Sequence, residues 1–190
     1  MEWFNQPASS EIENFQSNES GAPFSSLRVK ALGHSDYWRK THNGLIRDNG
    51  HFLHVNVSRN FEAFVSVSGQ YKSLYDHGGL MVRIDSENWV KAGIEYVEGI
   101  LNISAVVTRD FSDWSVIHLE NPQIKVHFKI KWVDGSFEVF YSIDGEKYIM
   151  YRVSYLPKVE NVQVGIMCAS PESDDGFDIQ FDDFRLKYLE

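Results

Sequence analysis

The sequence predicts an all-β protein in which two antiparallel sheets pack face to face as a sandwich. Apolar and polar residues alternate with a period of two along most of the chain, two Asp-Gly pairs mark tight turns, and no segment has the spacing of an amphipathic helix. Aromatic residues make up 14% of the 190 residues, which supplies a large apolar core. A chain of this length forms one sandwich, so we expect a single domain over 1–190, with the polar residues 1–20 loosely ordered in part.

The alternation is clearest in five segments, each with its apolar side chains on one face: 80–85, 90–97, 127–132, 162–168 and 177–182. Such strands are typical of antiparallel sheets with one face on a core. Shorter apolar runs predict further strands near 24–32, 45–48, 51–57, 61–70, 102–108 and 113–119. This number of strands is typical of a sandwich.

Asp134-Gly135 and Asp144-Gly145 each lie between two runs of strand-forming residues. Asp-Gly supplies the positive φ angles of a type I′ turn, which connects adjacent antiparallel strands. The three strands that these pairs join, within 127–150, should therefore form a meander.

The net charge of -9 bears on partners and compartment. An acidic chain without a Lys/Arg cluster is repelled by phosphate backbones, which argues against nucleic acid and anionic membranes as partners. The first residues lack the basic and apolar regions of a signal peptide, and no run approaches the roughly 20 apolar residues of a membrane span. We therefore expect a cytoplasmic protein.

The one cysteine, Cys168, shares a strand face with apolar residues and should be buried and unreactive.

The main candidate site is the polar face of a predicted hairpin over 80–96. Strand parity places a set of polar and aromatic residues on one side of it: Arg83, Asp85, Trp89, Lys91 and Glu95. A turn centred on Glu87 would set Arg83 directly opposite Lys91, and two like charges in that position need Glu95, Asp85 or a bound anion to compensate them. The face is either a ligand groove or an ordinary solvated surface.

Further candidates for ligand contact surround this hairpin. Tyr75 and His77 lie in the loop that leads into it, followed by Gly78-Gly79, which permits close approach of a ligand. Trp114, like Trp89, could offer a flat apolar surface to the C–H face of a sugar ring. Trp38 belongs to a second polar and aromatic cluster, where it either caps the core or meets a ligand.

No catalytic or metal-binding motif is present. The sequence has no Gly-x-Ser-x-Gly elbow, P-loop or Gly-x-Gly-x-x-Gly fingerprint, and no His pair with zinc spacing. The acidic residues within 174–183 are interpreted as an outward strand face rather than a calcium loop. We therefore expect no metal and no cofactor.

Several ordered segments resemble an uncharacterised family that is named after the yeast regulation-of-enolase protein. These segments are Tyr75 to Asp85, Trp89 to Tyr96, Val106 to Thr108, Ser112 to Ser115, Tyr141 to Glu146 and Phe181 to Phe184. The resemblance covers roughly 20–188 and implies a concanavalin A-like, jelly-roll sandwich of the lectin and glucanase type. It implies no reaction, and the family name suggests a regulatory link to central carbon metabolism.

Glycoside hydrolysis is the alternative that this fold raises. It needs two suitably spaced carboxyls, and the Glu-x-Asp-x-x-Glu pattern of sandwich glucanases is absent. Arg83 and Lys91 should lower the pKa of Glu95, whereas a general acid needs a raised pKa. We therefore expect a non-catalytic binding or regulatory protein, whose ligand is a sugar-like or anionic small molecule or whose partner is a glycolytic enzyme such as enolase. The alternatives are a divergent carbohydrate-active enzyme that uses Glu95 and a scaffold without a small ligand.

Overall fold

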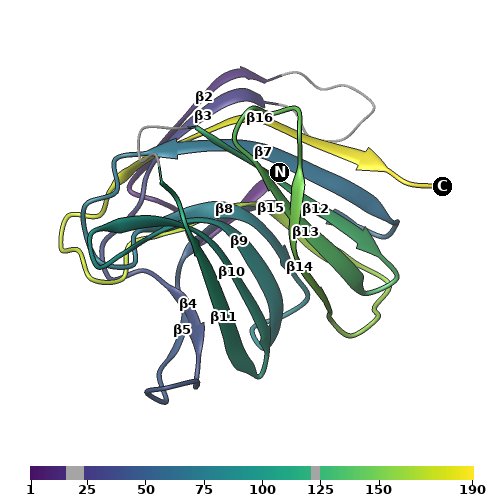
Figure 1. Cartoon of the computed structure of the whole chain (residues 1–190), viewed down its shortest axis with the longest axis horizontal. Coiled ribbons are helices and arrows are strands. Elements are labelled where there is room, and N and C mark those ends of the chain that lie inside the picture. Colours follow the sequence, from purple (N-terminus) through teal and green to yellow (C-terminus); the bar gives the residue numbers. More distant parts are fainter. Residues whose placement is uncertain (16–23, 121–124) are drawn as a thin grey trace.

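The computed structural model describes residues 1–15, 24–120 and 125–190, and within these ranges it contains strands and no helix. Two seven-stranded antiparallel sheets face each other, and a separate two-stranded hairpin lies beside the first sheet (Figure 1). The first sheet has the order β1-β6-β15-β8-β9-β10-β11 and the second has the order β14-β13-β12-β7-β16-β3-β2. The all-β sandwich predicted from the sequence is confirmed.

The first sheet consists of β1 (Glu2–Phe4), β6 (His51–Val57), β8 (His77–Arg83), β9 (Asn88–Val97), β10 (Ile100–Arg109), β11 (Phe111–His118) and β15 (Val162–Ala169). The second consists of β2 (Ser9–Phe15), β3 (Phe24–Lys30), β7 (Phe61–Gly69), β12 (Val126–Val133), β13 (Ser136–Ser142), β14 (Ile149–Tyr155) and β16 (Asp178–Tyr188). The hairpin consists of β4 (Tyr37–Arg39) and β5 (Ile46–Asp48). Each strand predicted from the sequence is present, with bounds that differ by a few residues.

The N-terminal segment, which we expected to be loosely ordered in part, contributes one strand to each sheet. β1 pairs with β6 in the first sheet, and β2 pairs with β3 in the second. Backbone pairing and the packing of Trp3 and Phe4 against buried apolar side chains hold these residues in place. The remainder of the expected loose segment, 16–20, lies outside the described residues.

The meander β12-β13-β14 is confirmed, but its two turns differ. Asp134 and Gly135 both have positive φ angles, as a type I′ turn requires. In the second connection only Gly145 has a positive φ, and the Asp144 carboxylate accepts hydrogen bonds from the backbone N–H groups of Glu146 and Lys147. The second turn is therefore a longer loop built on a side-chain hydrogen bond, not a type I′ turn.

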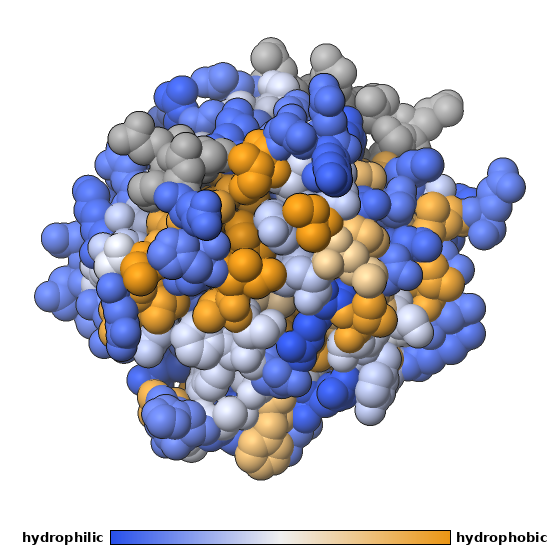
Figure 2. Space-filling model, in the orientation of Figure 1, coloured by the Kyte–Doolittle hydropathy of each residue, from blue (hydrophilic) through white to orange (hydrophobic). Residues whose placement is uncertain are grey.

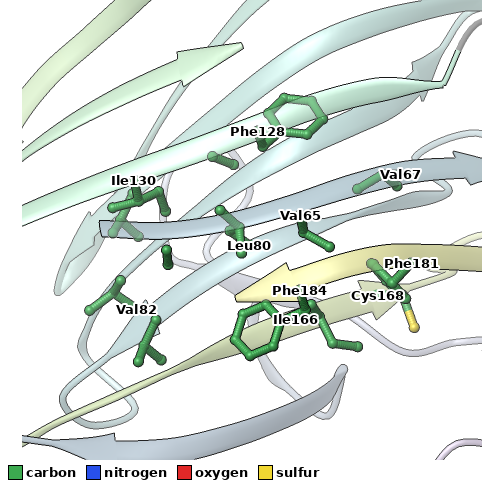
Figure 3. Close-up of a cluster of buried hydrophobic side chains, with 14 of the residues drawn as sticks. Val65, Val67, Leu80, Val82, Phe128, Ile130, Ile166, Cys168, Phe181 and Phe184 are labelled. Atoms are coloured by element: carbon green, nitrogen blue, oxygen red, sulfur yellow. The ribbon is translucent and has the colours of Figure 1, made fainter. Parts of the chain in front are cut away.

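The main core lies between the two sheets. Figure 3 shows Val65 and Val67 of β7 on one side and Leu80 and Val82 of β8 on the other. Cys168 belongs to this core and is fully buried, as its strand parity predicted. Because one face of each sheet is committed to this core, polar residues of alternate parity point to the outer faces.

The hairpin β8-β9 has the predicted parity but not the predicted register. Arg83 pairs with Trp89 and Met81 pairs with Lys91, so Arg83 does not face Lys91. The turn is centred on Ser86 because the Asp85 carboxylate accepts hydrogen bonds from the N–H groups of Glu87 and Asn88 and so fixes the loop one residue earlier. The like-charge conflict expected from the sequence does not arise.

Candidate functional site

The outer face of the first sheet is half covered and half open. Residues 36–48, which contain β4 and β5 and are called here the covering hairpin, pack on this face (Figure 1). A second buried cluster lies under the hairpin: Tyr37, Phe52, Met81, Trp89, Val106 and Met167. The remaining polar residues of the face gather at the open side of the covering hairpin.

Three of the predicted ligand-contacting residues belong to the covered half. Trp89 is fully buried against Tyr37, with 6.1 Å between the ring centroids, so it is a core residue and not a ligand platform. Arg83 is buried and paired with Asp48, with its guanidinium over the Phe4 ring. Trp38 packs against the buried cluster and donates its Nε1–H to the Thr41 carbonyl. The sequence-based assignment of Arg83 and Trp89 to an open groove is wrong, because a distant segment covers them.

Gly93 lines a small hollow in the open half of this face, and a second glycine, Gly79, lies opposite it. Gly79 and Gly93 are directly paired across β8 and β9. A Cβ at Gly79 would overlap the Ala92 carbonyl oxygen, and a Cβ at Gly93 would overlap the Gly78 carbonyl oxygen. Only glycine fits at either position, because backbone atoms of the paired strand occupy the place that a side chain would need.

Glu95 lies in β9 at this hollow and is 6% exposed. Its Oε2 accepts hydrogen bonds from Ser104 Oγ at 2.5 Å and from Trp114 Nε1 at 2.8 Å. Burial raises the pKa of Glu95, and the nearby Lys91 ammonium opposes this rise without cancelling it. The sequence-based expectation of a lowered pKa for Glu95 is wrong, because it counted the neighbouring charges and omitted desolvation.

Lys91 and His77 form the second polar element of the site. Lys91 Nζ donates to the Tyr37 carbonyl and to His77 Nε2, both at 2.9 Å, and lies 3.6 Å from an oxygen of Asp36. His77 Nδ1 donates to the Tyr75 carbonyl at 2.7 Å. Burial, with the Lys91 charge, holds the pKa of His77 well below its usual value. His77 is therefore a neutral acceptor for Lys91 at physiological pH.

Tyr75 and Trp114 form the rim. Their rings meet edge to face with 6.2 Å between centroids, and Trp114 is 37% exposed. Tyr75 has a φ of 65°, which is unusual for a bulky residue, and its N–H donates to the Tyr96 carbonyl. Local strain of this kind is found at binding sites, where it positions a side chain. The two rings place apolar surface beside the Glu95 carboxyl.

The hollow itself is small. It is lined by His77, Lys91, Glu95, Ser104, Met167 and the chain at 92–94, and its volume is about 10 Å³, which is the room that a single water molecule needs. Five predicted residues thus come together: Tyr75, His77, Lys91, Glu95 and Trp114. Sequence reasoning missed Ser104, which lies within an apolar run, and it assigned Asp36 to the separate cluster of Trp38 rather than to this site.

A larger hollow of about 590 Å³ lies on the outer face of the second sheet. It is lined mainly by polar side chains of β2, β3, β7 and β16, including Arg28, Lys30, Asp178 and Gln180. Lys30 and Asp178 form an exposed ion pair there. Exposed pairs of this kind are common on solvated surfaces, so this hollow lacks the buried polar groups that distinguish the Glu95 site.

Residues 1–15, 24–120 and 125–190 hold neither a cluster of metal ligands nor a membrane-spanning helix. No group of three or more His, Cys, Asp or Glu side chains is close enough together there to hold a metal ion. Nor does this part of the chain contain a helix with the length and apolar character needed to cross a bilayer.

Comparison with known proteins adds a family and a set of structural neighbours. The sequence profile of the family described as "Protein of unknown function (DUF1349)" matches residues 3–188. "Regulation of enolase protein 1" of Saccharomyces cerevisiae is 36% identical over 152 residues, which span 80% of this chain and 76% of that protein. A crystal structure of a functionally unknown protein from the same yeast superposes with a TM-score of 0.89 at 32% identity, covering 100% of this chain and 96% of the other.

Among solved structures of lower identity, a xylan β-1,4-xylosidase from Bacillus halodurans superposes with a TM-score of 0.69 at 15% identity. The match covers 97% of this chain and 40% of the xylosidase chain, so it concerns one part of that enzyme. This likeness shows the sandwich fold alone.

Proposed function

This chain belongs to the family described as "Protein of unknown function (DUF1349)", and we propose that it is a non-catalytic binding protein with a regulatory role. Its ligand, a sugar-like or anionic small molecule, occupies the open half of the first sheet's outer face. The observation that carries this proposal is the Glu95 carboxyl, which is buried on a rigid strand and anchored by Ser104 and Trp114 beside a hollow. Buried polar groups that converge on a hollow are characteristic of ligand sites.

The proposal is tested by calorimetric titration of the purified protein with neutral sugars, sugar acids and sugar phosphates. Glu95→Gln and Trp114→Ala should each weaken binding at least tenfold while keeping a cooperative melt. Two matched controls lie outside the site: Glu138→Gln on β13 and Phe111→Ala, an exposed aromatic residue on the same strand as Trp114. If the control variants lost as much binding as the site variants, or if the site variants lost no binding, the ligand would not bind at this site.

A protein partner is a second candidate, favoured by an exposed apolar surface. The edge strands β11 and β14 lie side by side, joined by an Arg152–Asp113 ion pair of 2.7 Å. Exposed apolar side chains gather on them: Val116, Ile117, Ile149, Met150 and Val153. Figure 2 shows apolar side chains near the middle of the face on which the edges of the two sheets meet. Contiguous exposed apolar surface is typical of protein interaction sites.

The name of the yeast relative makes enolase the first partner to test. Binding of the purified protein to purified enolase, measured by biolayer interferometry, should weaken at least tenfold in Val153→Glu. Ile12→Glu is the control, because Ile12 is similarly exposed but lies on the edge strand β2 of the second sheet. If both variants bind enolase like the parent protein, the β11–β14 edge is not the surface that enolase contacts.

A further inference from the structure

The hydrogen bonds at the hollow leave little for a ligand to use. The Lys91 ammonium donates to the Tyr37 carbonyl and to His77 Nε2, and it forms an ion pair with Asp36 across 3.6 Å. Both ring nitrogens of His77 are engaged, because Nδ1 donates to the Tyr75 carbonyl and Nε2 accepts from Lys91. His77 therefore has no free donor or acceptor for a ligand, and the Lys91 ammonium is held in place by two hydrogen bonds and one ion pair.

Glu95 is the exception. Its Oε2 accepts from Ser104 and Trp114, and Ser104 Oγ in turn accepts from Trp114 Nε1 at 3.1 Å. Its Oε1 accepts no hydrogen bond from the described residues, and it is not one of the buried polar atoms that are closed to solvent. The hollow thus presents one carboxylate oxygen as its acceptor, and a ligand group that enters must carry a proton to donate.

The volume of the hollow and the charges that line it further restrict the chemical group that can enter it. A volume of about 10 Å³ admits one oxygen-sized group. A cationic group would be attracted by Glu95 but repelled by the Lys91 ammonium, and an anionic group would be attracted by Lys91 but repelled by the Glu95 carboxylate. Both cases place like charges together in a poorly solvated site, where their repulsion is strong. A neutral hydroxyl meets every requirement.

The covering hairpin limits the rest of the ligand. It meets the hollow directly, since Tyr37 accepts from Lys91, and it buries Trp89 and Met81 beyond. The outer face is therefore closed on that side and open only past Tyr75 and Trp114. A polymer chain cannot continue through a groove that is closed at one end, whereas a small molecule or a chain end can lie on the two rings with one hydroxyl in the hollow.

Building on the function proposed above, we infer that the ligand is a small neutral polyol or the terminal unit of a glycan, which donates one hydroxyl to Glu95 Oε1. The C–H face of its ring lies against Trp114 and Tyr75. Gly93 lines the hollow without a side chain, which leaves its floor at the level of the backbone.

The test is a calorimetric titration with matched sugars that differ in charge: glucose, glucuronate and glucosamine, and galactose, galacturonate and galactosamine. Xylose, sorbitol and short linear oligosaccharides extend the neutral set, and β-cyclodextrin supplies a glycan without a chain end. We expect at least one neutral probe to bind, its charged counterparts to bind at least tenfold more weakly, and β-cyclodextrin not to bind. Glu95→Gln turns an NH₂ donor toward the hollow and should weaken the neutral probe at least tenfold, whereas Glu138→Gln should leave it unchanged.

The outcomes separate this inference from the function on which it rests. If a charged counterpart bound more tightly than its neutral sugar, or if β-cyclodextrin bound, the inference of a neutral hydroxyl ligand would be overturned. If Glu95→Gln abolished the binding of that probe, the proposed binding site would still stand. Binding that neither Glu95→Gln nor Trp114→Ala affects would overturn both, as would a complete lack of binding by the whole set of probes.

Discussion

Arg83 and Asp48 form a buried ion pair, with 2.8 Å between Nη2 and Oδ2, that fastens the covering hairpin to the first sheet. The Arg83 side chain is 9% exposed and its guanidinium lies 4.5 Å from the centroid of the Phe4 ring. The pair thus joins β1, β5 and β8, which come from three separate parts of the sequence. The ion pair holds the covering hairpin over one half of the outer face of the first sheet, and Glu95 lies in the other half.

Arg83→Ala should destabilise the protein by about 2–4 kcal/mol, because removing one partner of a buried pair leaves the other charge uncompensated. Lys158→Ala, which removes an exposed pair with Asp134, should change the free energy of unfolding by less than about 1 kcal/mol. Urea denaturation of both variants measures the difference. Equal, small effects would mean that the Arg83–Asp48 pair is solvated in solution.

The raised pKa of Glu95 predicts a pH-dependent stability. A carboxyl whose pKa is higher in the folded than in the unfolded state contributes stability that is present below the unfolded pKa of about 4.5 and is lost as the pH rises through the folded pKa. Glu95→Gln cannot titrate, so its stability relative to the parent protein should rise with pH across this window and then stay constant. Urea denaturation in half-unit steps from pH 4 to 8 measures it, with Glu138→Gln as the control. A relative stability that falls with pH would show that attraction to Lys91 outweighs burial.

Gly93→Ala should cost at least about 3 kcal/mol or prevent folding, because the added Cβ would overlap the Gly78 carbonyl in the paired strand. Gly99→Ala is the matched control, since Gly99 has a φ of 87° but open space around it. That variant should cost about 1–2 kcal/mol from backbone strain alone. Similar losses in the two variants would show that β8 can move away from β9.

The binding protein should not hydrolyse glycosides. Its raised pKa makes Glu95 suitable as a general acid, but hydrolysis needs a second carboxyl across the substrate. Asp36, the other carboxyl whose charge acts on Glu95, is paired with Lys91 in the covering hairpin. We expect no release of p-nitrophenol from aryl β-xylosides, β-glucosides or β-galactosides. Turnover that Glu95→Gln abolishes, with the fold intact, would replace the binding function by an enzymatic one.

The strands and their parity could be predicted because period-two alternation is a local property. Parity alone placed Leu80 and Val82 in the main core and Lys91 and Glu95 on the outer face, as the structure confirms. The register of the β8-β9 hairpin could not be predicted in the same way, since the side chain of Asp85 decides where the turn closes.

The environment of the site could not be predicted from local pattern either. Trp89 is buried by Tyr37, 52 positions earlier in the chain, and Arg83 pairs with Asp48, 35 positions earlier. No periodicity in 36–48 predicts these contacts. The direction of the pKa shift of Glu95 was wrong for the same reason, because neighbouring charges can be read from a sequence whereas desolvation depends on the packed structure.

The position of β16 has a consequence for how the protein is made. This strand comes last in the sheet by sequence, yet it lies between β7 and β3 in the middle of the second sheet. While the ribosome is still synthesising residues 178–188, β3 and β7 have no neighbour between them, and the emerging chain exposes two unpaired strand edges. Such edges are prone to aggregate. The second sheet can therefore be completed only after the residues of β16 have left the ribosomal tunnel.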